Sequence, residues 1–213
     1  MPVTPRLLKG GIVLIDPETA KVERVIALQY NPDSLTRTLQ IQGAGEGGER
    51  SEALRLRGPA VETIKVDAEI DATDSMELGD PTVAELGIHP QLAALETIIY
   101  PSSAQLESNN TLAESGTLEI LPMETALVLF VFGQNRILPV RLTDFSVTEE
   151  AFDPNLNPIR AKVSLGMRVL TVDDVGFNHK AGSLFMSYLQ QKEALRNKHP
   201  SGTLGALGLT GIP

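Results

Sequence analysis

The first residues that could do chemistry lie in a glycine-rich stretch. Residues 43–48 match the G-x-G-x-x-G spacing that holds a dinucleotide pyrophosphate, and Asp67 follows at about the distance of a ribose-binding acid. No helix with an apolar face follows the stretch, however, and Glu46 and Glu49 would repel phosphate. We therefore expect a flexible loop rather than a nucleotide site.

Four acidic residues lie close together in the chain and could attract a cation: Asp67, Glu69, Asp71 and Asp74. Their spacing lacks the central glycine and the distal glutamate of a calcium-binding loop. The first three alternate along one predicted strand, so we expect them to share its solvent face. The neighbouring acids Glu149 and Glu150 do not form a general acid–base pair, because adjacent strand residues point to opposite faces.

The three histidines are His89, His179 and His199, and none has a second histidine or a carboxylate at the spacing of a zinc site. The chain contains no cysteine, which excludes disulfides, thiolate catalysis and Cys-based zinc sites. It also lacks the G-x-S-x-G turn of a serine hydrolase. We expect no catalytic residue, no metal and no cofactor, and we expect that the chain is not an enzyme.

Composition favours one β-rich unit with small additions. The chain has 213 residues, of which 42% are hydrophobic, so it can bury a core. Its net charge of −9 disfavours nucleic acid as a partner. No secretory signal is evident, and the longest apolar run, residues 126–132, is too short to cross a bilayer. We therefore expect no membrane insertion.

The strongest signal is architectural. Residues 27–42 and 152–170 each join an Asn/Asp-Pro corner to a strand with two-residue alternation. In the second segment the apolar residues fall on one face: Ala161, Val163, Leu165, Met167 and Val169. This pattern predicts a sheet with one buried face and one polar face.

The rest of the chain predicts further strands and two helices. A phase change within residues 137–149 predicts a β-bulge near Thr143 and Asp144. One helix is expected to begin at His89, and another spans about residues 183–198. Residues 74–87 indicate turns, and residues 102–115 a loop. Strands are expected at residues 12–15, 22–30, 35–42, 53–57, 62–71, 117–121 and 127–132.

Together the two corners resemble the tube-type proteins of contractile injection systems, which are phage-tail-like particles. The first corner is YNPDSL at residues 30–35, and it lies between an apolar strand and a polar-alternating strand. The second is FDPNLNPIRA at residues 152–161, and another alternating strand follows it. The order and spacing of the two corners agree with the family over about residues 8–172.

The resemblance implies a mainly β fold, a tail-tube-like β-barrel or sandwich with a flanking helix, to which the sequence pattern adds a C-terminal helix. We therefore expect a tube-like domain at residues 1–175, a helical extension at 176–199 and a flexible Gly/Leu tail at 200–213. Several relatives carry a LysM module after this domain. Its absence here favours the subgroup of adaptors that join the inner tube to the spike and baseplate.

The resemblance also implies partners, namely a homo-oligomeric ring of about six copies and the inner tube, spike and baseplate proteins. Assembly is expected in the bacterial cytoplasm, and release in an extracellular particle is left open. The alternatives are an inner-tube protein proper and a stand-alone β-sandwich binding module or hydrolase. The resemblance assigns structural or interface roles to Tyr30, Asn31, Pro32, Phe152, Asp153, Pro154, Asn157, Pro158 and Arg160.

Overall fold

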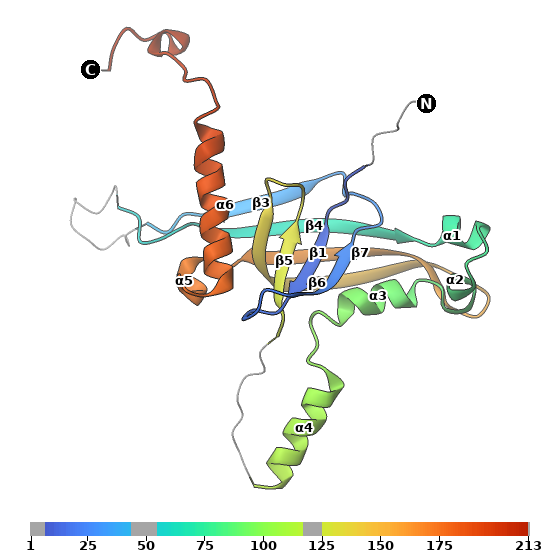
Figure 1. The fold of residues 1–213 in the computed structure, drawn as a ribbon. Coiled ribbons are helices and arrows are strands. Elements are labelled where there is room, and N and C mark those ends of the chain that lie inside the picture. The colour runs from blue at the N-terminus through green and yellow to red at the C-terminus, as the bar shows by residue number, and fades with distance from the viewer. Residues whose placement is uncertain (1–6, 44–54, 117–124, 213) are drawn as a thin grey trace.

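The computed structural model describes residues 7–43, 55–116 and 125–212. Its strands form one antiparallel sheet in the order β2-β1-β5-β6-β7-β4-β3 (Figure 1). The seven strands are β1 Gly11–Ile15, β2 Val22–Ala27, β3 Leu35–Gln40, β4 Val61–Asp71, β5 Leu127–Val131, β6 Ile137–Phe152 and β7 Pro158–Val169.

The sheet curls into an incomplete barrel with an apolar inside. β1 and β4 lie far apart in the strand order, yet Ile12 and Leu14 of β1 share one buried cluster with Ile64 and Val66 of β4. Only a strongly curved sheet brings the inner faces of these strands together, and the right-handed twist of strands favours such curvature. β2 and β3 remain as the two edge strands.

The Gln29 side chain links the β2 edge of the curled sheet to β4, the strand next to the opposite edge. The Gln29 carboxamide, just after β2, donates from Nε2 to the Asp71 carbonyl oxygen at 2.6 Å. Its Oε1 accepts a hydrogen bond from the Asp71 amide at 3.0 Å. The carboxamide therefore exchanges a donated and an accepted hydrogen bond with one backbone residue, as paired residues of neighbouring antiparallel strands do.

The alternation predicted for the second corner segment is confirmed. Each of the five inward residues of β7 is at most 1% exposed. The predicted bulge is confirmed as well, since the register of β6 shifts between Leu142 and Asp144. Gly166 of β7 makes room there, because a Cβ on Gly166 would lie only 2.7 Å from the Asp144 Cβ.

Helices flank the sheet, so the prediction of a mainly β fold with flanking and C-terminal helices is confirmed. α3 buries Leu92 and Leu95 against the barrel core, and α6 buries Phe185 and Tyr188 there. The helices are α1 Thr73–Glu77, α2 Pro81–Leu86, α3 His89–Glu96, α4 Ser103–Glu114, α5 Val172–Val175 and α6 Lys180–Arg196, and a 3-10 turn, η2, covers Leu204–Leu207.

The prediction of a loop at residues 102–115 is wrong, because α4 lies there. Ser102 and Gln105 form a capping box in which each side chain bonds the other's backbone N–H, and this starts the helix. None of the α4 residues is buried, and Figure 1 shows α4 projecting away from the sheet. The strand predicted at 117–121 and most of the glycine-rich stretch lie outside the described residues.

The strand predicted at residues 53–57 is described only from residue 55. There the structure has a single bridge between Gly43 and Leu56. The turns predicted at 74–87 are replaced in part by the short helices α1 and α2. Pro81 and Pro90 lie in the first turns of α2 and α3, where the missing N–H of proline costs nothing.

Candidate interface at the two proline corners

The first corner fixes the N-terminal approach to β1. The Asn31 side chain accepts a hydrogen bond from the Gly10 amide at 2.9 Å and donates one to the Leu8 carbonyl at 2.8 Å. Pro32 follows, half-buried, and presets the backbone of the turn into β3. Tyr30 is 43% exposed, and its hydroxyl accepts a hydrogen bond from Gln29 Nε2 at 3.5 Å.

The second corner is a tight turn between β6 and β7, organised by Asp153. Its carboxylate accepts hydrogen bonds from the backbone amides of Asn155 and Asn157 at 2.8 Å each, and from the Asn157 side chain at 2.9 Å. The Asn157 side-chain bond is the largest cause that holds the pKa of Asp153 below its usual value. The turn leaves two apolar side chains exposed, Phe152 at 50% and Leu156 at 78%.

The start of β7 is joined to the helical excursion after β4. The Asn157 side chain donates to the Glu85 carbonyl at 3.0 Å, and the Ile88 amide donates to the Pro158 carbonyl at 2.9 Å. Gly87 has a φ of +55°, and a Cβ there would lie 2.3 Å from the Pro158 carbonyl oxygen. Only glycine fits this approach, so the second corner and α2 are held as one unit.

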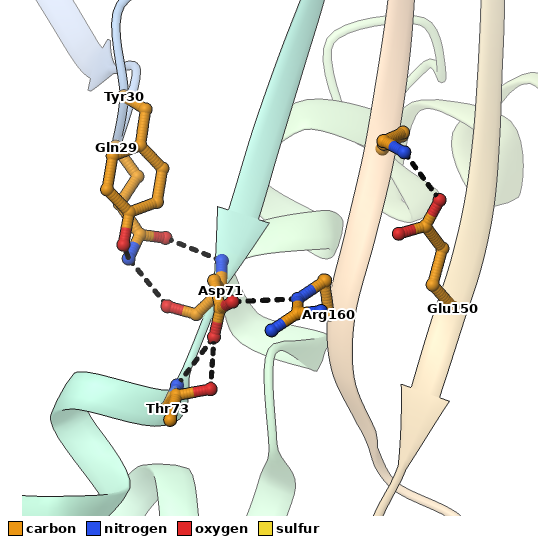
Figure 2. A network of polar contacts seen from close by, with 7 residues as sticks. Gln29, Tyr30, Asp71, Thr73, Glu150 and Arg160 are labelled. Carbon is orange, nitrogen blue, oxygen red and sulfur yellow. Dashed lines mark hydrogen bonds and ion pairs between the residues drawn. The ribbon is translucent and has the colours of Figure 1, made fainter.

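A polar network connects the two corners (Figure 2). Asp71, at the end of β4, has its backbone bound by Gln29, next to Tyr30. Its carboxylate accepts from Arg160 Nε at 2.7 Å and from the amide and hydroxyl of Thr73. The Thr73 hydroxyl is the largest cause lowering the pKa of Asp71, and the Arg160 guanidinium adds to it.

A second ion pair lies beside this network. Lys162 Nζ contacts the Glu150 carboxylate at 2.8 Å, and this hydrogen bond raises the pKa of Lys162. The negative charge of Glu69 also acts on both Lys162 and Arg160. Together these groups line a shallow depression on the outer face of the sheet, formed by Tyr30, Glu69, Asp71, Glu150, Arg160 and Lys162.

The structure therefore brings the two corners to one end of the sheet. Tyr30 and Arg160 line the same depression, and Pro158 starts the strand that carries Arg160. Sequence reasoning did not assign Gln29 or Lys162 to this site. Gln29 offers no signal in the sequence, because its role depends on β2 and β4 meeting after the sheet has curled.

This arrangement is suited to binding a macromolecular surface. Protein interfaces typically have a polar rim and an apolar centre that is rich in aromatic residues. The surface ion pairs fit such a rim, and the exposed Tyr30, Phe152 and Leu156 fit such a centre. Within the described residues, no group of three or more acidic or histidine side chains could hold a metal ion. His179 serves locally, since its Nδ1 accepts the Ala181 amide at the start of α6. No described helix is long and apolar enough to cross a membrane.

A separate charged cluster fixes α6 to the barrel. Glu62, on the inner side of β4, has a side chain only 5% exposed. Its carboxylate contacts Arg37 Nε at 2.7 Å and Lys192 Nζ at 3.1 Å, while Arg37 also donates to the Tyr188 hydroxyl at 3.0 Å. Burial by itself raises the pKa of Glu62, but the Arg37 hydrogen bond and the Lys192 charge outweigh it and lower the pKa.

Acid should destabilise the protein through these carboxylates. The pKa values of Glu62, Asp71 and Asp153 lie below their usual values of 4.5, 3.8 and 3.8. Their stabilisation is therefore fully present above about pH 4.5 and is lost as the pH falls through the lower folded-state values. Urea unfolding between pH 7 and pH 3 should show the midpoint falling below about pH 4. Glu62→Gln should flatten this dependence, and a midpoint that stays constant to pH 3 would contradict it.

Comparison with known proteins gives a weak structural likeness alone. No known family profile matches the chain, and a search of curated proteins gives no match. One similar solved structure is the tail of an empty gene transfer agent particle with C6 symmetry, at 11% identity and a TM-score of 0.29, covering 76% of this chain and 90% of the other. Another is the virion of a native gene transfer agent particle, at 10% identity and a TM-score of 0.26, covering 75% and 90%. TM-scores this low do not establish a shared fold.

Proposed function

We propose that this chain is a structural subunit of a contractile injection particle and that copies of it form a ring joining the inner tube to the spike and baseplate. The sequence resemblance of the two corners supports the class of particle. The curled, mainly β sheet is the fold which that resemblance implies, and both corners lie at one end of it. A ring subunit needs edges that meet its neighbours and projections that meet adjacent layers.

The observation that carries the proposal is the pair of open sheet edges. Edge strands present unpaired backbone groups, and proteins that stay monomeric usually protect them with charge or cover. Here β2 exposes Val22 at 53% and Val25 at 64%, while β3 and the residue after it expose Leu39 at 49% and Ile41 at 76%. Apolar side chains on both edges are suited to contact with neighbouring copies.

The two projections favour an adaptor over a stacking tube protein. α4 leaves the barrel on one side, and α6 carries the tail away on the other (Figure 1). An inner-tube protein stacks as many identical layers, each of which would have to accommodate both projections. A single ring between unlike neighbours has no such constraint, so the adaptor remains the proposed role and the inner tube the second candidate.

The direct test is to image particles that contain a tagged copy of the chain. Electron microscopy and quantitative mass spectrometry should find a handful of copies at one end of a tube, in a ring of about six. Tens of copies or more along the tube would favour the inner-tube role. A strictly monomeric chain that no sheath-and-tube assembly contains would overturn the proposal.

Charge placed on the edges should prevent ring formation. We expect Val22→Lys and Leu39→Lys each to lower ring incorporation at least tenfold, because a lysine on an edge strand blocks pairing while remaining solvated in the monomer. The matched control is Leu78→Lys, at a site 87% exposed near the end of α1 and away from both edges. Incorporation of all three variants at the wild-type level, measured by particle pull-down, would contradict an edge contact.

A further inference from the structure

The last described segment of the chain is an apolar turn that buries none of its side chains against the described part of the chain. Residues 200–213 contain no charged side chain. Four of their large apolar residues are well exposed: Leu204 at 41%, Leu207 at 73%, Leu209 at 46% and Ile212 at 79%. The 3-10 turn places Leu204 and Leu207 on one side, because residues three apart align in that helix. The segment is therefore a preformed pair of leucines at the end of a linker.

An apolar groove lies elsewhere on the barrel, between β2, the end of β4 and α3. It has a volume of about 360 Å³, within the range of pockets that hold a ligand. Most of its lining is apolar, with Val25, Ile26, Ala27, Ile70, Ala94 and Leu95, and its polar lining is Arg24, Gln29, Glu69 and Gln91. The groove lies along the gap between β2 and β4 that the Gln29 side chain bridges by two hydrogen bonds to Asp71.

We infer that this groove binds the Leu204–Leu207 turn of a second copy of the chain. The turn is apolar and so is most of the groove, and the turn brings no charge that would lose its hydration there. The linker is short and contains Pro200 and Gly202, so that the turn can be oriented without unfolding α6. The inference goes beyond the proposed function, since it describes how two copies join in any assembly.

The distance from the end of α6 to the groove argues against binding of the chain's own tail there. Lys192 of α6 contacts Glu62 at the start of β4, and the groove lies about 20–27 Å further along that strand at about 3.3 Å per residue. The linker at residues 197–203 spans at most about 25 Å, and α6 has carried its origin beyond Glu62. Folding back would need an almost fully stretched linker, which is entropically costly. Binding of the turn to the groove of a neighbouring copy does not require the linker to be stretched, so that entropic cost is absent.

Turn and groove are different surfaces, so the contact is heterologous. Figure 1 places the tail at the far end of α6, away from α3. A heterologous contact repeated around an axis closes a ring when the rotation allows it, and otherwise continues as a filament. A tail-in-groove contact would thus set the order of copies in one direction around an assembly.

The absence of cysteine from the chain allows a specific cross-linking test. Leu207→Cys on a copy with a longer tag is mixed with Ala94→Cys on an untagged copy, and the pair is oxidised with glutathione disulfide. We expect a disulfide-linked heterodimer, at least tenfold above the yield with Ser108→Cys, which lies on the exposed helix α4. Adding Leu204→Asp to the Leu207→Cys copy should remove the excess.

The outcomes separate the possible occupants of the groove. A double variant with Leu207→Cys and Ala94→Cys on one chain should give dimers and higher species in preference to an internal link. A monomeric internal disulfide would assign the groove to the chain's own tail and overturn the inference. A heterodimer yield no higher than that of Ser108→Cys, repeated with Ala27→Cys in place of Ala94→Cys, would also overturn it. Neither result would alter the edge-strand proposal.

Discussion

Arg37→Met should lower the free energy of unfolding by about 2–3 kcal/mol, because it leaves a buried carboxylate with fewer partners. The Glu62 side chain is 5% exposed, and Arg37 provides its shortest ion pair. Methionine keeps most of the straight-chain volume but removes the charge and the hydrogen bonds. Lys192 stays in contact, so the cost is smaller than for a carboxylate left with no partner.

Chemical unfolding in urea measures this loss, and a thermal scan should show a melting temperature lower by roughly 4–12 °C. The control is Glu62→Gln, alone and combined with Arg37→Met. Once the carboxylate is neutral, removing Arg37 should cost much less, and this double-mutant cycle isolates the interaction between the two groups. Equal costs of Arg37→Met in both backgrounds would show that Arg37 stabilises the fold by other contacts.

Gly87→Ala should also be strongly destabilising, by about 2–3 kcal/mol. The residue has a φ of +55°, which an L side chain rarely adopts. In addition, its new Cβ would lie 2.3 Å from the Pro158 carbonyl oxygen, so the backbone of α2 or of the second corner must shift. The shift should break the hydrogen bond from the Ile88 amide to Pro158.

Gly79→Ala is the matched control for this variant. Gly79 also has a positive φ, at +73°, but open space surrounds the position of its Cβ. It should therefore cost only the backbone strain, about 1–2 kcal/mol. The difference between the two urea midpoints reports the close approach at the second corner. Equal destabilisation by the two alanines would contradict a steric role for Gly87.

Strands were predictable from the sequence because their signal is local. Two-residue alternation in β4 and β7 indicates which side chains face the core, and the apolar residues predicted to face inward are all buried. The phase change in β6 likewise predicted the bulge. The start of α3 was visible from Pro90, since proline is compatible with the first helical turn.

Other features depend on contacts between distant segments or on weak local signals. α4 has no apolar stripe, so periodicity could not reveal it, and the Ser102–Gln105 capping box was the remaining sign. Glu62 lies on the apolar side of β4. Its buried carboxylate is stabilised by Arg37 of β3 and Lys192 of α6, which are distant in the sequence. The joining of the corners through Asp71 depends on the curl of the whole sheet.

α4 has a consequence for how this protein can diverge between lineages. Most barrel residues are constrained by packing, since a change at Val163 or Leu165 must fit its neighbours. α4 buries none of its side chains, so substitutions there are nearly free of the cost that the core imposes. Packing therefore constrains this helix far less than it constrains the strands, and its sequence can change while the barrel stays the same.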